Sequence, residues 1–332
     1  METELRGDTR RRILQYLFRH GAASRQALAA ALGVSMPTVL SHVQALVGQG
    51  LAAEDGQYDS TGGRRAAVIT GVPSARLALG VDVTGRDLGL AVVDLAGRLL
   101  FHRRAALRYR NEPAYYEALG ALTREFWTDS AGSAALPLGV GVSIAGILSP
   151  DGARITTSHT LNVQNVDCGL FRAVLPGDCL FINDANAAGL AEMSELGGAR
   201  SMVYLSLSGS VGGAVFMQGK LALGANQRCG EVGHLRLLPG RRCYCGQDGC
   251  ADAYCNAGVL SALSGGRLDL FFAGLAGGNP VYRAAWDEYL DALALLIVSL
   301  RMVLDCDVVA GGAVGAYLSP YLPELRARVT AL

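Results

Sequence analysis

A glycine-rich segment at residues 230–255 carries the side chains whose types and spacing most clearly indicate chemistry. Within seventeen of its residues lie one imidazole and three thiols: His234, Cys243, Cys245 and Cys250. Three thiolates and an imidazole complete the tetrahedral ligand set of a structural zinc ion and leave no coordination position for a reactive water. The glycines allow the tight backbone that Cys243 and Cys245 need to reach one ion across a single intervening residue. We therefore predict a structural Zn²⁺ site, with unconnected free cysteines in a loop as the alternative.

The composition is typical of a globular protein. The chain has 332 residues, of which 51% are hydrophobic and 17% are charged, and it contains 43 glycines. This length and composition predict an α/β protein of two or three domains. The N-terminus lacks a basic region followed by a long apolar run, and the apolar run Ala292–Leu304 is too short to cross a bilayer. We expect a cytoplasmic protein with reduced cysteines and no membrane association.

The first seventy residues predict three helices followed by a β-hairpin. Two serines are placed to cap the second and third helices, and two glycines are placed to end the first and second: Ser24, Ser35, Gly21 and Gly33. The spacing of apolar residues predicts a buried stripe on the third helix that consists of Val39, Val43, Leu46 and Val47. Two short strands, Leu51–Glu54 and Arg65–Ile69, form the predicted hairpin.

Three helices and a basic hairpin are typical of a winged helix-turn-helix, in which the third helix enters the major groove and arginines contact phosphates. Arginines also outnumber acidic residues over the first fifty positions. We predict that the third helix and the hairpin contact double-stranded DNA through Ser35, Thr38, Ser41, His42, Gln44, Arg64 and Arg65. The alternative is a small helical bundle that serves dimerisation or partner docking.

The remainder of the chain predicts two similar α/β lobes. Strands begin near Leu79 and Leu88, and a helix is expected at Tyr115–Trp127. A second half repeats this order from Met202 onward and ends with a strand that runs into Gly311 and Gly312. Glycine-rich turns after the strands indicate a ligand cleft between the lobes. We predict three domains: residues 1–72, residues 73–182 and residues 183–332.

These features together resemble the ROK family of repressors, open reading frames and sugar kinases, in its form with an N-terminal winged helix. The resemblance covers about residues 10–325 and rests on NDAN at 183–186, GEVGH at 230–234, CYCGQDGC at 243–250 and AGGAV at 310–314. It implies a winged helix-turn-helix joined to a two-lobed, actin-like (hexokinase-type) α/β domain, assembled as a homodimer or homotetramer. Family members usually continue well beyond Gly312 with a helix that packs on the first lobe, whereas this sequence ends at Leu332.

The same resemblance implies which residues bind a sugar or sugar phosphate. Asn183 and Asp184 correspond to the pair that binds sugar hydroxyls, and in the kinases this aspartate is the general base. The alternative for this pair is an N-cap of a helix at Ala187–Leu196. Glu231 and His234 lie in the family's ligand-binding loop, where the histidine reaches the sugar with one ring nitrogen and zinc with the other. Asp252 stands where the family usually has a glutamate, and its side chain is one methylene shorter. We therefore expect either a bulkier ligand there or a contact that runs through water.

Departures in the phosphate-binding turns favour a repressor over a kinase. A kinase cradles ATP phosphates with backbone N–H groups in glycine turns. Thr84 and Arg86 replace a glycine and a threonine of the first turn, and Ser208 and Ser210 replace two glycines of the second. We therefore predict a sugar-responsive repressor of carbohydrate metabolism with no catalytic residue. The alternatives are a ROK sugar kinase with a DNA-binding head, which would use Asp184 as its base, and a regulator controlled by a protein partner.

Overall fold

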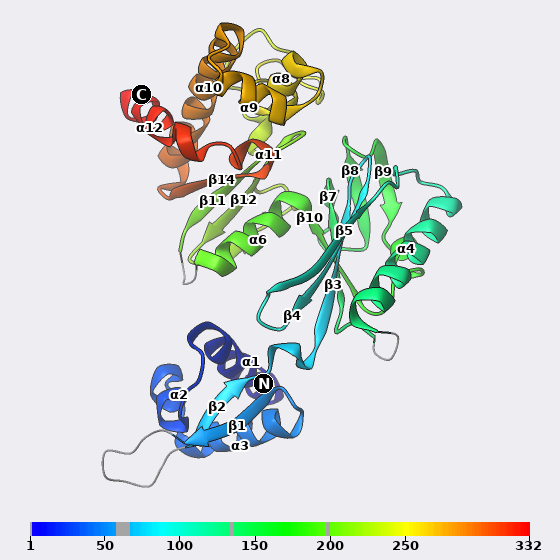
Figure 1. Ribbon diagram of the computed structural model, residues 1–332, viewed down its shortest axis with the longest axis vertical. Helices are drawn as coiled ribbons and strands as arrows, with labels where there is room; N and C mark the ends of the chain where they lie inside the picture. The colour runs from blue at the N-terminus through cyan, green and yellow to red at the C-terminus, as the bar shows by residue number, and fades with distance from the viewer. Residues whose placement is uncertain (1, 58–66, 133–135, 197–199) are drawn as a thin grey trace.

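The structure, a computed structural model, describes residues 2–57, 67–132, 136–196 and 200–332. The described chain forms a small N-terminal head and two larger α/β lobes (Figure 1). The head and each lobe have a separate cluster of buried apolar side chains. No single helix in these ranges has both the length and the apolar composition needed to cross a membrane. Two pairs of helices meet both criteria when each pair is taken together, but each pair is sharply bent.

The head consists of three helices and an antiparallel hairpin. Their bounds are α1 (Glu2–His20), α2 (Arg25–Leu32), α3 (Met36–Gly48), β1 (Ala52–Gln57) and β2 (Ala67–Gly71). The predicted caps are confirmed, because Ser24 accepts the N–H of Ala27 and Ser35 accepts the N–H of Thr38. Gly33 ends α2 with a left-handed φ of 66°, and α2 and α3 are bent 115° to one another, as in a helix-turn-helix.

The first lobe is built on a five-stranded sheet with the order β10-β6-β3-β4-β5. The strands β3, β4 and β5 form an antiparallel meander, and β6 and β10 run parallel to β3. Helix α4 (Pro113–Ala131) covers one face of this sheet, and α5 (Gly169–Arg172) carries Phe171 into the same core. The strand bounds are β3 (Leu77–Val83), β4 (Leu88–Asp94), β5 (Leu99–Ala105), β6 (Val140–Ile144) and β10 (Cys179–Asn183).

A small antiparallel sheet extends the first lobe beyond β6. Its strands are β7 (Ile147–Leu148), β8 (Arg154–Ser158) and β9 (Val163–Asp167). The loop between β8 and β9 carries His159, which lies in contact with the second lobe through the ring of Tyr244. This small sheet therefore provides one of the connections between the lobes.

The second lobe repeats the topology of the first. Its sheet has the order β13-β12-β11-β14, with β11, β12 and β13 as the antiparallel meander and β14 parallel to β11. The strand bounds are β11 (Met202–Leu207), β12 (Val211–Met217), β13 (Lys220–Ala222) and β14 (Asp307–Gly311). The sequence prediction of two similar α/β lobes is confirmed by this repeat.

Helices pack on the second sheet and at the junction between the lobes. Helix α6 (Asp184–Leu196) follows β10 directly and contacts strands of both sheets, so it joins the two lobes (Figure 1). Arg283 and Arg328 form ion pairs that hold α12 against α10. The helices after α6 are α7 (Asp252–Cys255), α8 (Ala257–Ser261), α9 (Leu268–Ala276), α10 (Pro280–Leu304), α11 (Gly312–Gly315) and α12 (Leu322–Ala331).

Candidate functional site

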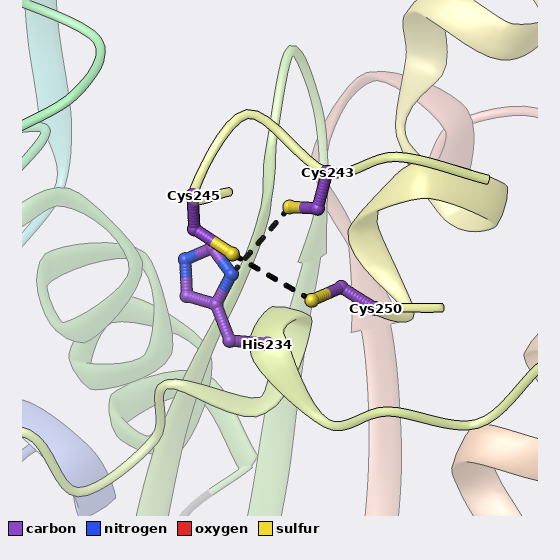
Figure 2. A group of neighbouring side chains, drawn as sticks. All are labelled: His234, Cys243, Cys245 and Cys250. Atoms are coloured by element: carbon purple, nitrogen blue, oxygen red, sulfur yellow. Dashed lines mark hydrogen bonds between the residues drawn. The ribbon is translucent and has the colours of Figure 1, made fainter. Parts of the chain in front are cut away.

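The four predicted metal ligands converge in the second lobe. One ligand atom from each of His234, Cys243, Cys245 and Cys250 lies within 4.8 Å of the others (Figure 2). The Nδ1 atom of His234 is 3.7 Å from the Cys243 sulfur, and the sulfurs of Cys245 and Cys250 are 3.7 Å apart. These separations resemble those between ligands of one tetrahedral ion, whose Zn–S and Zn–N bonds are about 2.3 Å and 2.0 Å. The donor set therefore fits zinc.

Tight turns bring these ligands together. The N–H of Cys243 donates to the carbonyl of Gln247, and the N–H of Gly246 donates to the carbonyl of Cys243, so the chain reverses around Cys245, the second cysteine. Gly249 has a φ of +83°, and a Cβ atom at this position would overlap the carbonyl oxygen of Leu238. Only glycine tolerates this backbone and this approach, so the glycine before Cys250 is required by the turn.

Tyr244 lies between Cys243 and Cys245 in the sequence, and it connects the four predicted metal ligands to the first lobe. Its hydroxyl is 3.4 Å from the Nε2 atom of His234, the ring nitrogen that faces away from the sulfurs. The same His234 nitrogen is 4.0 Å from a carboxylate oxygen of Glu231. The Tyr244 ring also contacts the ring of His159, with 5.3 Å between centroids. The two nitrogens of His234 thus face the thiols on one side and the junction between the lobes on the other.

Asp184 is the carboxylate whose environment is most strongly perturbed at this junction. Burial raises its pKa to about 6, and the like charges of Asp82 and Glu231 add to this increase. One oxygen of Asp184 accepts the N–H of Ala185. Because Asp82 belongs to the first lobe and Glu231 to the second, Asp184 lies where acidic groups of both lobes approach. This is the arrangement expected of a site that binds several hydroxyl groups.

Asn183 is engaged within the protein. Its amide nitrogen donates to the carbonyl of Gly146 at 3.1 Å, and its oxygen accepts the N–H of Asn186 at 3.1 Å. The helix begins at Asp184, three residues earlier than predicted, with Asn183 directly before it. The alternative interpretation as a helix cap is therefore found for Asn183, whereas Asp184 stays available in the first turn of α6.

Asp252, the third predicted carboxylate of the ligand site, is buried against β12. Asp252 is only 2% exposed, and its carboxylate accepts the N–H of Val211 at 2.5 Å. Burial raises the pKa of this group. Its position two residues after Cys250 turns the side chain toward β12, where a buried N–H needs an acceptor. Asp252 therefore supports the strand next to the loop that carries the four predicted metal ligands, residues 234–250, which we call the metal loop.

At the first of the two predicted phosphate-binding turns, which contains Thr84 and Arg86, the polar side chains pair with one another. Arg104 donates to Asp87 at 2.6 Å and lies 3.6 Å from Asp82, whose other oxygen accepts the hydroxyl of Ser143 at 2.9 Å. Asp82 pairs with Gly89 across the sheet, and Gly89 pairs with Arg104 on the next strand. Because Gly89 has no side chain, the guanidinium extends across it to the aspartate.

At the second predicted phosphate-binding turn, which contains Ser208 and Ser210, a side chain likewise pairs with a neighbouring group. The Ser208 hydroxyl oxygen accepts the N–H of Ala313 at 3.1 Å, in the first turn of α11. This N–H group is one that a phosphate would bind at a helix N-terminus. Both turns that would hold ATP phosphates thus have polar groups paired with side chains of the chain.

A pocket of about 380 Å³ lies against the first-lobe sheet on the side that faces α6. Its lining comes from all five strands of this sheet and from Ala187 of α6, and its polar residues include Asp82, Arg104 and Ser143. It does not include Glu231 or His234. The pocket therefore adjoins the filled first turn and is separate from the metal loop.

The predicted DNA-binding residues differ in exposure. Ser41 and Gln44 are exposed on α3, and Ser35 and Thr38 form its N-terminal cap. His42 was predicted to face outward but is 6% exposed, and its Nδ1 accepts a hydrogen bond from Arg10 at 3.4 Å. Val47 was predicted to be buried but is 36% exposed. Arg64 and Arg65 lie outside the described residues.

The corrections on α3 follow from helix geometry. Residues three and four apart share a face, so His42 lies on the same side as Val39 and Leu46. Val39 and Leu46 are both buried, and the histidine therefore points into the core of the head. Val47 is one position further around the helix than Leu46 and is exposed with Leu40.

The sequence analysis did not identify three residues that contact the candidate site or the phosphate-binding turns. Tyr244 stands between two predicted ligands, and this position was a usable signal. Arg104 and His159 lie in segments without a motif, and only the sheet register and the contact between lobes show their roles.

Comparisons with known proteins agree with this geometry. A family model described as "ROK family" matches residues 78–332, and one described as "Helix-turn-helix domain" matches residues 8–55. The xylose repressor of Bacillus spizizenii is 26% identical over 253 residues, which are 75% of this chain and 65% of that protein. The chain thus spans slightly less than two thirds of that relative.

Two further similarities represent the two functional classes. An N-acetylmannosamine kinase of Vibrio cholerae is 26% identical over 249 residues, or 71% of this chain and 84% of the kinase. The solved structure of a ROK family transcriptional regulator, a homolog of the Escherichia coli MLC protein, superposes with a TM-score of 0.76 at 18% identity. That superposition covers 93% of this chain and 84% of the other, and it shows the same fold. The chain belongs to the ROK family and carries an N-terminal helix-turn-helix domain.

Proposed function

We propose that this chain is a cytoplasmic, sugar-responsive DNA-binding repressor of carbohydrate metabolism. The observation that carries the proposal is the presence, in one chain, of a helix-turn-helix head and a two-lobed ROK domain. Similarity to the xylose repressor supports it. The three domains, residues 1–72, 73–182 and 183–332, remain part of the proposal. The apolar clusters support this division, because the head and the first lobe each have one and the second lobe has two.

The metal site in this proposal is structural. His234, Cys243, Cys245 and Cys250 would hold Zn²⁺, and the ion would supply a fixed crosslink without an open coordination position. The crosslink holds the loop that carries Glu231. Tyr244 contacts the second nitrogen of His234, a type of contact that fixes the orientation of a ligating imidazole.

The effector site in this proposal lies between the lobes. Asp184, Glu231 and the Nε2 side of His234 supply hydrogen-bond acceptors and donors for neighbouring sugar hydroxyls. Asn183 contributes by capping α6 and holding the carbonyl of Gly146, which positions Asp184. Asp252 contributes by fixing β12 beside the metal loop.

The filled phosphate turns favour a repressor over the alternative of a sugar kinase. A kinase requires backbone N–H groups and a metal-binding carboxylate that are accessible to ATP. Here Arg104 neutralises Asp82 and Asp87, and Ser208 takes an N–H of α11. Two observations support the kinase alternative: the retained Asp184 with its raised pKa and the similarity to the N-acetylmannosamine kinase. A coupled ADP-release assay across hexoses and N-acetylhexosamines separates the two, because turnover near one per second, the low end of ordinary enzymes, would reject our choice.

The response mechanism follows from operator geometry. In a homodimer, two heads bind half-sites that are separated by whole turns of DNA, so a small change in lobe arrangement weakens their simultaneous binding. Fluorescence anisotropy with duplexes selected from a random library would measure DNA affinity with and without xylose, glucose, N-acetylglucosamine and their phosphorylated forms. Specific duplex binding that shifts with one sugar supports the proposal. DNA affinity that no sugar changes contradicts the sensor function, and no duplex enrichment contradicts DNA binding itself.

A further inference from the structure

The outward face of α3 is more apolar than expected for a helix that recognises bases through hydrogen bonds alone. Met36 is 43% exposed and Leu40 is 41% exposed, while Val39 and Val43 on the opposite side are buried. Residues four apart lie on one face of a helix, so Met36, Leu40 and Gln44 form a single stripe. We call these three residues the α3 stripe.

The polar residues of α3 are partly engaged elsewhere. The Ser35 hydroxyl accepts the N–H of Thr38 and lies 2.7 Å from the Thr38 hydroxyl, so both belong to the helix cap. His42 faces the core and contacts Arg10. Ser41 and Gln44 are therefore the exposed hydrogen-bonding side chains in the middle of α3.

The position of the α3 stripe agrees with a contact in the major groove. In a helix-turn-helix, the N-terminal part of the second helix of the motif meets the base edges. The 115° bend between α2 and α3 is in the range of such a motif. Between Met36 and Gln44 the helix rises about 12 Å at 1.5 Å per residue, which spans three to four base-pair steps of about 3.4 Å.

We propose, on the basis of the DNA-binding function proposed above, that Met36 and Leu40 contact thymine methyl groups and that Gln44 pairs with an adjacent adenine. Apolar side chains distinguish thymine by its 5-methyl group, and glutamine forms two hydrogen bonds with the N6 and N7 atoms of adenine. The operator half-site then contains thymines at adjacent positions next to an adenine. The protein then recognises these bases mainly through contacts with methyl groups, and less through hydrogen bonds from the polar residues of α3.

The test removes single methyl groups from the DNA. Duplexes are first selected from a random library with the full chain, and each thymine of the enriched site is then replaced by deoxyuridine, which keeps every hydrogen bond. At each contacted position, we expect about fourfold weaker binding, the ratio equivalent to the ~0.8 kcal/mol of one buried methylene-sized group. This series uses the unmodified chain and does not depend on the folding of any variant.

A mutant cycle then assigns the methyl group to a side chain. In L40A, binding to the thymine duplex should weaken about fourfold, and deoxyuridine at the Leu40 position should have no further effect. V47A is the matched control, because Val47 is also exposed and apolar but lies seven residues further along α3. V47A should retain the full deoxyuridine effect.

Three results would overturn the inference. Binding that is indifferent to every deoxyuridine excludes methyl contacts, and an equal deoxyuridine effect in L40A and the unmodified chain excludes Leu40 as the reader. A change of oligomeric state in L40A, measured by light scattering, would make the α3 stripe a protein interface. In all three cases duplex enrichment still supports DNA binding, whereas absence of enrichment rejects the DNA-binding function together with this inference.

Discussion

The metal loop and the two phosphate turns differ in what satisfies their polar groups. In the metal loop, four donor atoms from His234, Cys243, Cys245 and Cys250 face one another within 4.8 Å. In the phosphate turns, Arg104 pairs with Asp82 and Asp87, and Ser208 accepts the N–H of Ala313. The donors of the loop converge on a common point, whereas the groups of the turns are paired within the chain.

This difference provides a criterion for a working ligand site. Polar groups that converge without a partner of opposite charge have a cost in free energy that a ligand can offset. Groups that are already paired within the chain gain less free energy from binding a ligand. Asp184 and Asp252 extend the comparison to single carboxylates, because Asp184 lies near two like charges while Asp252 accepts a buried backbone N–H.

The largest effect is expected from a change in the metal loop. C245S removes one thiolate from the loop at a side chain that is only partly buried, so its effect on packing is small. We expect loss of the bound zinc and a decrease of about 10 °C in Tm, from ~4 kcal/mol of lost metal stabilisation at about 2–4 °C per kcal/mol. Metal content by mass spectrometry and thermal unfolding by circular dichroism measure both.

The matched control for this prediction is C179S. Cys179 is also partly buried but lies on β10, outside the metal loop, and its sulfur donates to the carbonyl of Gly177. A serine hydroxyl retains that donor. Equal zinc content in C245S, C179S and the unmodified chain would mean that the loop binds no metal through Cys245, and the contrast with the phosphate turns would then disappear.

A smaller loss of stability is expected for D252A. The substitution leaves the N–H of Val211 buried without its acceptor, which costs ~1–3 kcal/mol. We expect Tm to decrease by about 5 °C, at about 2–4 °C per kcal/mol, while zinc content stays unchanged. Unchanged stability together with a loss of sugar response would show instead that Asp252 contacts the ligand, as the family resemblance implied.

Local sequence signals predicted the parts of the fold and site that depend on neighbouring residues. The caps at Ser24, Gly33 and Ser35 and the metal ligand spacing were of this kind, because turns and helix ends are determined within a few positions. Glycine-rich turns and alternating apolar strands likewise indicated the repeated lobes.

Contacts between distant segments were outside the reach of such signals. The burial of His42 depends on its packing against Arg10 of α1, and the role of Asp252 depends on an N–H of β12. Arg104 meets Asp82 only because the sheet register places Gly89 between them. In each case the sequence shows the residue type, while its partner comes from tertiary structure.

The smallest change in stability is expected for D184N, which should stabilise the fold, whereas C245S and D252A should destabilise it. The pKa of Asp184 is about 6 in the folded chain and about 3.9 in an unfolded chain. A carboxyl group with a raised pKa in the folded state stabilises the fold below the unfolded pKa, and this contribution is lost as the pH rises through about 6. Asparagine has no charge to bury, so D184N should be more stable than the unmodified chain at about pH 7 by ~1 kcal/mol, and equally stable near pH 4.

Urea unfolding of both proteins between about pH 4 and pH 8 measures this difference. The amide oxygen of the introduced asparagine can still accept the N–H of Ala185, so the start of α6 is preserved. A gain in stability together with a loss of sugar response would place Asp184 with the metal loop, as a group held in an unfavourable state for its ligand. If D184N were destabilised at neutral pH, the carboxylate would instead belong with Asp252 and the phosphate turns, among the groups whose partners are supplied by the chain.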